Sequence, residues 1–295
     1  MYTTLISVEQ LRDLLAAKAR LMVFDCSFEL MDPVAGEKHY LQAHIPAAVY
    51  AHLEHALSDP PQPDADGHLR TPGDAASGGR HPLPSREKFA TWLSSVGFAN
   101  DMQAVVYDRN GNNYCGRLWW MLKWVGHDAV AVLDGGLQAW QAAGGEVRAG
   151  AEPSHFQSNF EAGPPLRTLV TTDEVARALG QAGQTLIDAR AAPRYRGEVE
   201  PLDPVAGHIP GALNRPFASN LGPDGRFKPA GQLRAEFEQL LQGRDPRGVV
   251  HHCGSGVSAV PNLIAMEIAG FAPTALYAGS WSEWCRTPGL PVEKG

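Results

Sequence analysis

The sequence predicts an α/β protein in which one fold occurs twice in tandem. Short apolar runs of the β type alternate with helical patterns along the chain, which is typical of a parallel sheet flanked by helices. Several motifs of the first half also recur in the same order in the second half, and such a long-period repeat indicates a duplicated unit. The length of 295 residues suits two domains of ordinary size.

The repeat can be followed motif by motif. An apolar run that ends in an aspartate, Asp25 or Asp188, is followed by a His-Ile-Pro motif in each half. A later apolar run leads to Asp108 in the first half and to Cys253 in the second. The pattern predicts an N-terminal domain over residues 1–145, a linker over 146–167 and a C-terminal domain over 168–295.

Local signals predict how each copy begins and where the chain is irregular. Ser7 with Gln10, and Thr171 with Glu174, form capping-box patterns at the start of a helix in each copy. Residues 144–167 are rich in Gly, Pro, Ser and Ala with little periodicity, which predicts a connection across the surface. Residues 58–84 are too long for an ordinary loop and are expected to form a functional or mobile segment.

Composition and charge exclude several classes of protein. The formal net charge is -7 and no cluster of Lys and Arg stands out, so the basic surface of a nucleic-acid binder is not expected. The apolar stretch at residues 21–24 is too short for a signal peptide or a membrane span, which predicts a cytoplasmic protein without a membrane partner. The four cysteines include no Cys-x-x-Cys pair, so neither a zinc site nor a disulfide framework is expected.

Cys253 is the candidate nucleophile. It follows the strand-like run Val249-Val250-His251 and opens a loop before a helical pattern. At a strand-to-helix turn, converging backbone N–H groups and the helix N-terminus favour an anionic sulfur. Glycines in the loop permit tight curvature. The residues expected to cradle the anion are Gly254, Gly256, Val257, Ser258 and Ala259. A packed, inert thiol at an ordinary turn is the alternative interpretation.

A cysteine that opens such a loop in the second of two copies resembles the two-domain rhodaneses, and the similarity covers nearly the whole chain. The loop Cys253-Gly254-Ser255-Gly256-Val257-Ser258-Ala259 is similar to that of the 3-mercaptopyruvate sulfurtransferases. Thiosulfate sulfurtransferases of the same family usually carry two basic residues directly after the cysteine. The resemblance implies two tandem rhodanese-like domains, of which the first is catalytically silent because Asp108 takes the place of the cysteine.

The resemblance also implies contacts to the sulfur donor. Arg194 matches an arginine that holds the carboxylate of the donor, and a planar guanidinium suits that task. A second arginine is expected a little further on, where this sequence reads Glu200-Pro201-Leu202-Asp203-Pro204. Ser255, His81 and Glu54 match the members of a proton relay that would protonate the leaving group. Solvated surface positions for His81 and Glu54 are an equally good interpretation.

Other polar and aromatic residues are assigned to the fold. His44, His208, Asp25 and Asp188 occur in both the silent and the active copy, which favours structural roles. Cys26, Cys115 and Cys285 lie in no glycine-rich loop and are expected to be buried or incidental thiols. The tryptophans in helical segments are expected in the core: Trp119, Trp120, Trp124, Trp140, Trp281 and Trp284.

The expected activity is the transfer of sulfur from 3-mercaptopyruvate to a thiol, cyanide or a thioredoxin-like acceptor through a Cys253 persulfide, with no metal or organic cofactor. Thiosulfate as the small anionic donor, or a non-catalytic sulfur-carrier module, are the alternatives. A Cdc25-type phosphatase of the same fold would need an arginine at the sixth position after the cysteine, where this chain has Ala259. Phosphatase activity is therefore not expected.

Overall fold

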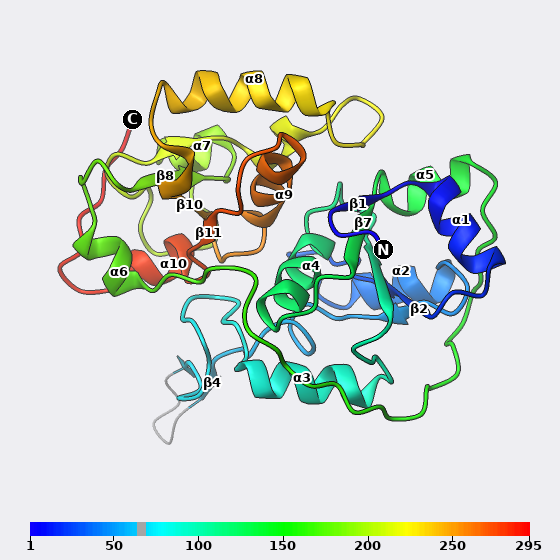
Figure 1. Ribbon diagram of the computed structural model, residues 1–295. Coiled ribbons are helices and arrows are strands. Elements are labelled where there is room, and N and C mark those ends of the chain that lie inside the picture. The colour runs from blue at the N-terminus through cyan, green and yellow to red at the C-terminus, as the bar shows by residue number, and fades with distance from the viewer. Residues whose placement is uncertain (64–68) are drawn as a thin grey trace. The chain divides into compact units, whose positions relative to one another are not determined.

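The computed structural model describes residues 1–63 and 69–295 (Figure 1). Contacts divide the chain into two compact units. The first unit comprises Met1–Leu57, Ser85–Leu166 and Leu221–Phe227, and the second comprises Ser58–Pro84, Arg167–Asn220 and Lys228–Gly295. The long irregular segment of the first half, part of which lies outside the described residues, is therefore grouped with the second unit.

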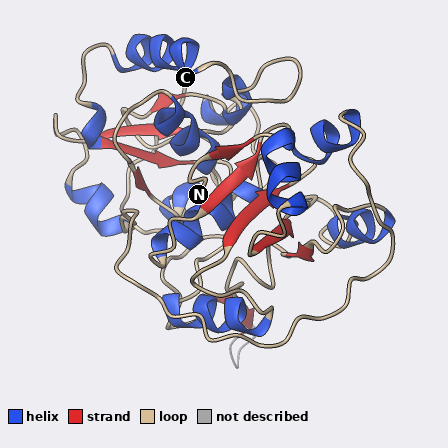
Figure 2. Ribbon diagram, turned by 45° about the vertical axis from the view of Figure 1, so that its right-hand side comes forward, coloured by secondary structure: helices blue, strands red, loops and turns tan. Residues whose placement is uncertain are grey.

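The first unit is built on a parallel sheet of five strands in the order β1-β7-β6-β2-β3. Figure 2 draws the strands of the chain in red and its helices in blue. Its strands are β1 (Leu5–Ile6), β2 (Leu21–Asp25), β3 (Val49–Tyr50), β6 (Gln103–Tyr107) and β7 (Val130–Leu133). Its helices are α1 (Val8–Ala16), α2 (Ala35–Gln42), α3 (Arg86–Ser95), α4 (Cys115–Trp124) and α5 (Gly136–Ala142).

Helices cover both faces of this sheet. Val23 of β2 belongs to a core cluster with Leu11 of α1 and Trp140 of α5. The next residue, Phe24, lies against Trp92 of α3, with 6.0 Å between the ring centroids. Successive side chains of a strand point to opposite faces, so α1 and α5 cover one face and α3 covers the other. This double cover explains why the strands read as apolar runs rather than as alternating patterns.

The second unit repeats the plan with a parallel sheet of four strands in the order β11-β10-β8-β9. Its strands are β8 (Thr185–Asp188), β9 (Leu213–Asn214), β10 (Val249–His252) and β11 (Ala275–Leu276). Its helices are α6 (Thr172–Arg177), α7 (Ala192–Tyr195), α8 (Ala230–Leu241), α9 (Val260–Ile268) and α10 (Ser280–Trp284), with short 3-10 helices η1 (Phe217–Asn220) and η2 (Pro246–Gly248). A small antiparallel pair, β4 (Gln62–Pro63) and β5 (Leu69–Arg70), also belongs to this unit.

The predicted α/β class, with one parallel sheet in each half, is confirmed. Both capping boxes are present: the Ser7 backbone N–H donates to Gln10 Oε1 at 2.9 Å, and that of Thr171 donates to Glu174 Oε2 at 2.8 Å. Residues 144–167 contain no helix or strand, and contacts group those up to Leu166 with the first unit. The six tryptophans predicted for the core lie in α4, α5 and α10 and are buried.

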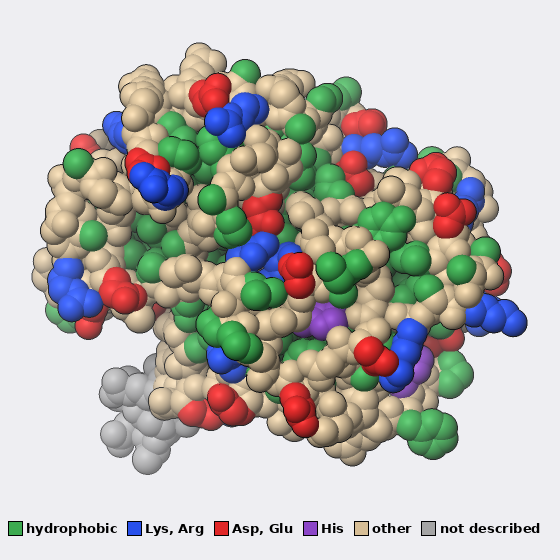
Figure 3. Space-filling model, viewed as in Figure 1, with side chains coloured by type: hydrophobic (Ala, Val, Ile, Leu, Met, Phe, Trp, Pro, Cys, Tyr) green, Lys and Arg blue, Asp and Glu red, His purple; other side chains and the backbone are tan. Residues whose placement is uncertain are grey.

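The surface agrees with the charge pattern of the sequence. On the face shown in Figure 3, Lys and Arg side chains are interspersed with Asp and Glu side chains. Within residues 1–63 and 69–295, no helix is long and apolar enough to cross a membrane.

Candidate active site

The Cys253 loop connects β10 to α9 at the carboxyl edge of the second sheet. The Cys253 side chain is buried, and its backbone N–H donates to Ser280 Oγ at 3.1 Å. The backbone N–H groups of Trp281 and Ser282 donate to the carbonyls of Cys253 and Gly254 at 3.0 and 2.8 Å. The turn at the start of α10 therefore holds the first two residues of the loop in place.

Gly256 is required by the geometry of this loop. Its φ is +75°, and a Cβ at this position would lie 2.2 Å from the carbonyl oxygen of Ala278. A side chain would be strained by the backbone conformation and would also clash with the neighbouring backbone. Of the other predicted cradle residues, Val257 and Ala259 are buried and Ser258 is partly exposed.

The matching loop of the first unit shows what a loop of this shape holds. Asp108 follows β6 as Cys253 follows β10, and α4 begins as far after Asp108 as α9 begins after Cys253. Gly111, the counterpart of Gly256, also has a left-handed conformation, with φ of +70°. The Asp108 carboxylate accepts four backbone N–H groups at 2.8 to 2.9 Å, from Asn110, Asn112, Tyr114 and Cys115. In this copy the loop cradles an anion that is part of the chain.

Ser255 and His81 lie together. Ser255 Oγ and His81 Nδ1 are 2.7 Å apart, and both residues are buried. His81 comes from segment 58–84, which explains how two residues far apart in the sequence can meet within one unit. Glu54, the third predicted relay member, belongs to the first unit, where its backbone N–H donates to His52 Nδ1 at 3.1 Å.

Arg194 lies at the end of α7 and is held by acidic side chains. Its Nη2 donates to Glu200 Oε1 at 2.7 Å and lies 3.5 Å from Asp203 Oδ2. A Cβ on Gly254 would lie 3.4 Å from Arg194 Nη1, so this guanidinium reaches the residue that follows Cys253. The acidic segment 200–204, which stands where a second arginine was expected, therefore orients the first one.

A buried ion pair lies on the same edge of the sheet. Arg190 makes a short contact to Asp188, with Nη2 and Oδ2 2.6 Å apart. Burial alone would raise the pKa of the Asp188 carboxyl, but His252 and Arg190 hold that pKa below its ordinary value. Burial would lower the pKa of Arg190, but Asp188 above all, and then Glu200 and Cys253, raise it. Arg190 is thus a cation near the sulfur.

The other three cysteines have a different environment. Burial raises the pKa of the Cys26 and Cys115 thiols well above the ordinary value, and it also raises the pKa of Cys285. None of the four cysteines forms a disulfide. The prediction that these three are buried or incidental thiols is confirmed for Cys26 and Cys115, which are buried, and agrees with the partial exposure of Cys285.

Comparison with known proteins determines the family. The sequence pattern of the Rhodanese-like domain matches this chain twice, at residues 7–143 and 171–287. The chain belongs to the rhodanese family. These two matches together cover most of the 295 residues and correspond to the two copies of the repeat.

Three relatives illustrate the range of this rhodanese. A protein of Pseudomonas aeruginosa named "Probable 3-mercaptopyruvate sulfurtransferase" is 46% identical over 276 residues, which cover 93% of each chain. The thiosulfate sulfurtransferase of Bos taurus is 32% identical over 293 residues, which cover 96% of this chain and 92% of the bovine one. The solved 3-mercaptopyruvate sulfurtransferase of Leishmania major is 30% identical, with a TM-score of 0.79 over 98% of this chain and 76% of that chain. The rhodanese described here is a sulfurtransferase of the 3-mercaptopyruvate and thiosulfate sulfurtransferase family.

Sequence reasoning missed two residues of this rhodanese site, Arg80 and Asp203. Arg80 Nη1 lies 2.5 Å from Asp203 Oδ1, and the Asp203 side chain is fully buried. Asp203 was noted only as part of a departure from the family pattern. The one available signal for Arg80 was its position directly before His81, because the contacts that define its role join residues more than a hundred positions apart.

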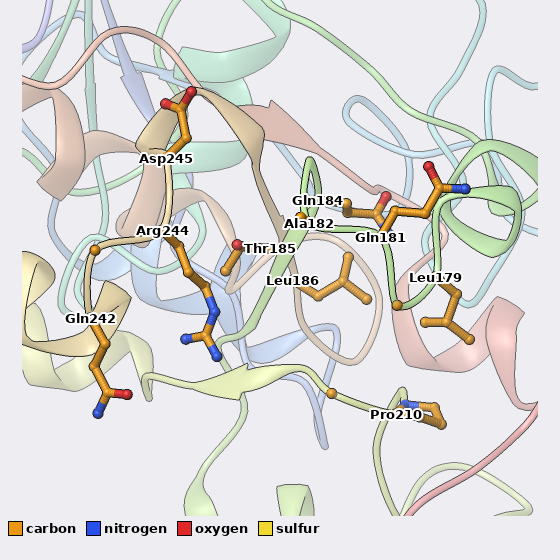
Figure 4. Close-up of a pocket in the computed structure, with 13 residues that line it drawn as sticks. Leu179, Gln181, Ala182, Gln184, Thr185, Leu186, Pro210, Gln242, Arg244 and Asp245 are labelled. Atoms are coloured by element: carbon orange, nitrogen blue, oxygen red, sulfur yellow. The ribbon is translucent and has the colours of Figure 1, made fainter.

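One hollow of the second unit lies away from this site. A cavity of about 580 Å³ lies at the amino end of β8, where it is lined by Thr185 and Leu186. Figure 4 shows Arg244 on one side of this cavity and Leu179 and Gln181 on the other. Cys253 follows the opposite, carboxyl end of the parallel strands, so the cavity is separate from the candidate active site. Among the residues described, no cluster of His, Cys, Asp and Glu side chains could hold a metal ion.

Proposed function

We propose that this rhodanese transfers sulfur from 3-mercaptopyruvate to a thiol, cyanide or a thioredoxin-like acceptor through a persulfide on Cys253. The observation that carries the choice of donor is the 2.7 Å contact between Ser255 Oγ and His81 Nδ1, two residues after the nucleophile. Removing sulfur from 3-mercaptopyruvate leaves a carbanion equivalent, the pyruvate enolate, which must take up a proton. Removing sulfur from thiosulfate leaves sulfite, a stable anion that needs none.

The first half-reaction forms the persulfide. The Cys253 thiolate attacks the thiol sulfur of 3-mercaptopyruvate, a sulfur–sulfur bond forms, and the carbon–sulfur bond breaks. Its electron pair stays with the carbon as pyruvate enolate, which the Ser255–His81 pair protonates to pyruvate. The thiol proton stays on the outer sulfur, so the product on the enzyme is a hydropersulfide.

The second half-reaction releases the outer sulfur. An acceptor thiolate attacks that sulfur, forms a new persulfide and returns Cys253 as a thiolate; cyanide would leave as thiocyanate. The two half-reactions share one enzyme form, so ping-pong kinetics are expected. Arg194 holds the donor carboxylate through Nη1, the nitrogen that its acidic neighbours leave available.

Thiosulfate is the second candidate donor, because two guanidinium groups approach Gly254 and would also bind a sulfonate. The two residues after Cys253 are neutral here, and the positive charge beside them comes from other segments. A carrier module that reacts only with a protein acceptor would load Cys253 but would turn over poorly with small acceptors.

Turnover with the two donors side by side tests the proposal. We expect a higher kcat/KM for 3-mercaptopyruvate than for thiosulfate. Ser255→Ala and His81→Gln should lower kcat for 3-mercaptopyruvate by about 10²-fold, the usual scale of general acid catalysis, and should lower kcat for thiosulfate much less. An equal loss with both donors would exclude the proposed protonation role.

A further inference from the structure

Segment 78–81 is fixed to the same turn that holds the Cys253 loop. The backbone N–H of Arg80 donates to Ser282 Oγ at 3.0 Å, and the backbone N–H of Ser282 donates to the carbonyl of Gly254 at 2.8 Å. Gly79, with φ of +85°, packs so closely that a Cβ would lie 2.6 Å from the carbonyl oxygen of Gly279. The place of Arg80 relative to the loop is therefore set by backbone contacts.

The guanidinium of Arg80 is only partly engaged. Nη1 donates to Asp203 Oδ1 at 2.5 Å, whereas Nε is buried and has no hydrogen-bond partner within the described chain. A buried N–H without a partner is costly, which suggests that a ligand completes the site. Nη2 lies 3.1 Å from the position that a Cβ on Gly254 would take. The atoms nearest to this position all belong to the guanidinium groups of Arg80 and Arg194.

Negative charge around this point is limited. The buried carboxylate of Asp203 is shared by Arg80, Arg194 and Arg286, at 2.5, 3.5 and 2.9 Å. Arg194 also contacts Glu200, which in turn contacts Arg190. Arg190 also pairs with Asp188, so three acids face four arginines, and the surplus positive charge favours an anionic ligand beside Gly254.

We propose that Arg80 is the second guanidinium of the donor site and binds the donor carboxylate together with Arg194, an inference that rests on the proposed function. Arg80 comes from segment 58–84 and takes over the task of the arginine that segment 200–204 lacks. Asp203 is the positioning residue, because its Oδ1 holds Nη1 of Arg80 and its Oδ2 lies 3.5 Å from Nη2 of Arg194. Arg80 Nε and Nη2 and Arg194 Nη1 remain to bind the ligand.

Alkylation of Cys253 tests this proposal without any sulfur donor. Iodoacetate and iodoacetamide deliver the same carbon to the thiolate and differ only in the carboxylate. The measured quantity is the ratio of the iodoacetate rate to the iodoacetamide rate at Cys253, followed at the Cys253 peptide by mass spectrometry. We expect this ratio to be higher in the wild type than in variants that lack one of the two arginines. Arg80→Gln and Arg194→Gln should each lower the iodoacetate-to-iodoacetamide rate ratio by about 3- to 10-fold, the scale of one partly exposed charge-assisted contact.

Arg286→Gln is the matched control. It removes another arginine from the same Asp203 carboxylate, but one that is not among the nearest groups to Gly254, so the rate ratio should change by less than about 2-fold. Arg80→Lys keeps the charge and should retain part of the ratio. Thermal unfolding of each variant distinguishes a lost contact from a lost fold.

Steady-state turnover supplies the second measurement. Arg80→Gln should raise KM for 3-mercaptopyruvate more than it lowers kcat. If the wild type failed to turn over 3-mercaptopyruvate while the alkylation ratio still depended on Arg80, the proposed donor would be wrong and the anion site would stand. An alkylation ratio that is unchanged in folded Arg80→Gln and Arg80→Lys would overturn the assignment of Arg80.

Discussion

Cys253 and Asp108 occupy equivalent positions in the two matching loops, and we propose that the difference between their side chains determines which copy reacts. The carboxylate of Asp108 satisfies four backbone N–H groups of its own loop. Cys253 brings a thiol into a loop that has nearby cations in Arg190, Arg194 and Arg80. A thiolate is both a nucleophile and an anion. Of the two loops, only the second therefore combines anion-binding backbone N–H groups with a nucleophilic side chain.

Cys253→Ser should abolish sulfur transfer and leave the fold intact, because a hydroxyl of similar size cannot form a persulfide. Cys115→Ser and Cys285→Ser serve as controls and should remain near the wild type. Mass spectrometry after incubation with donor should show one added sulfur atom in the controls and none in Cys253→Ser. Turnover by the Cys253 variant would contradict the mechanism.

Arg194→Ala should lower kcat/KM for 3-mercaptopyruvate by about one to two orders of magnitude, because the loss of one charge-assisted contact costs roughly 1.5 to 3 kcal/mol. Most of the change should appear in KM, since a carboxylate remote from the transferred sulfur is bound similarly in the ground and transition states. Arg196→Ala is the control: it removes an arginine two positions away that pairs with Glu198 at the surface. Equal losses in both variants would remove Arg194 from the donor site.

Gly256→Ala should destabilise the second unit by about 3 kcal/mol or more, because left-handed backbone and a clash with the Ala278 carbonyl add together. Gly243→Ala is matched in backbone, with φ of +83°, but a Cβ there would meet nothing within 4 Å. That control should cost only about 1 kcal/mol. Denaturant unfolding of the two variants compares them directly, and equal losses would show that the Ala278 contact does not matter.

Helices and loops differ in how much of them could be predicted. The capping boxes at Ser7 and Thr171 depend on residues three positions apart, so local sequence was sufficient. The Cys253 loop could be predicted because the repeat aligned it with a second loop. The contact between Ser255 and His81, and that of Arg80 with Asp203, join segments separated by 174 and 123 residues. Nothing in the local pattern of residues 58–84 indicates which unit that segment packs on.

Helix α8 contains a carboxylate, Glu236, whose contacts should be lost at low pH. Glu236 accepts hydrogen bonds from Arg215, Lys228 and Gln232, which outweigh a raising effect of burial and lower its pKa to about 2. A carboxyl whose pKa is lowered by folding stabilises the fold above its unfolded pKa of 4.5, and this stabilisation is lost as the pH falls from 4.5 toward 2.

Glu236→Gln should therefore be less stable than the wild type at pH 7 by about 1 to 2 kcal/mol, and the difference should vanish near pH 2. Glu238→Gln, which removes the exposed partner of Arg234, is the control and should show little pH-dependent difference. Urea unfolding of both variants across this pH range provides the measurement. A difference for Glu236→Gln that stays constant with pH would contradict the assigned contacts.

The whole molecule is a duplication, and we propose that only the second copy carries the reaction. Each unit has a parallel sheet and a loop after a central strand, β6 or β10, that leads into a helix. Because the loop of the first unit begins with the carboxylate of Asp108 rather than with a thiol, loading with the sulfur donor should yield one labile sulfur per chain. Release of thiocyanate by cyanide measures this stoichiometry, and a value near two would show that another cysteine is loaded.

In the first unit, the Asp108 carboxylate already occupies the backbone N–H groups that could bind a free anion. Asp108 acts as a tethered ligand, whose effective concentration far exceeds that of any free anion in solution. That loop should therefore be saturated at all times, while the loop at Cys253 is filled only by what the reaction brings. In a nuclear magnetic resonance titration with pyruvate or sulfite, amide signals of residues 254–260 should shift and those of residues 109–115 should not.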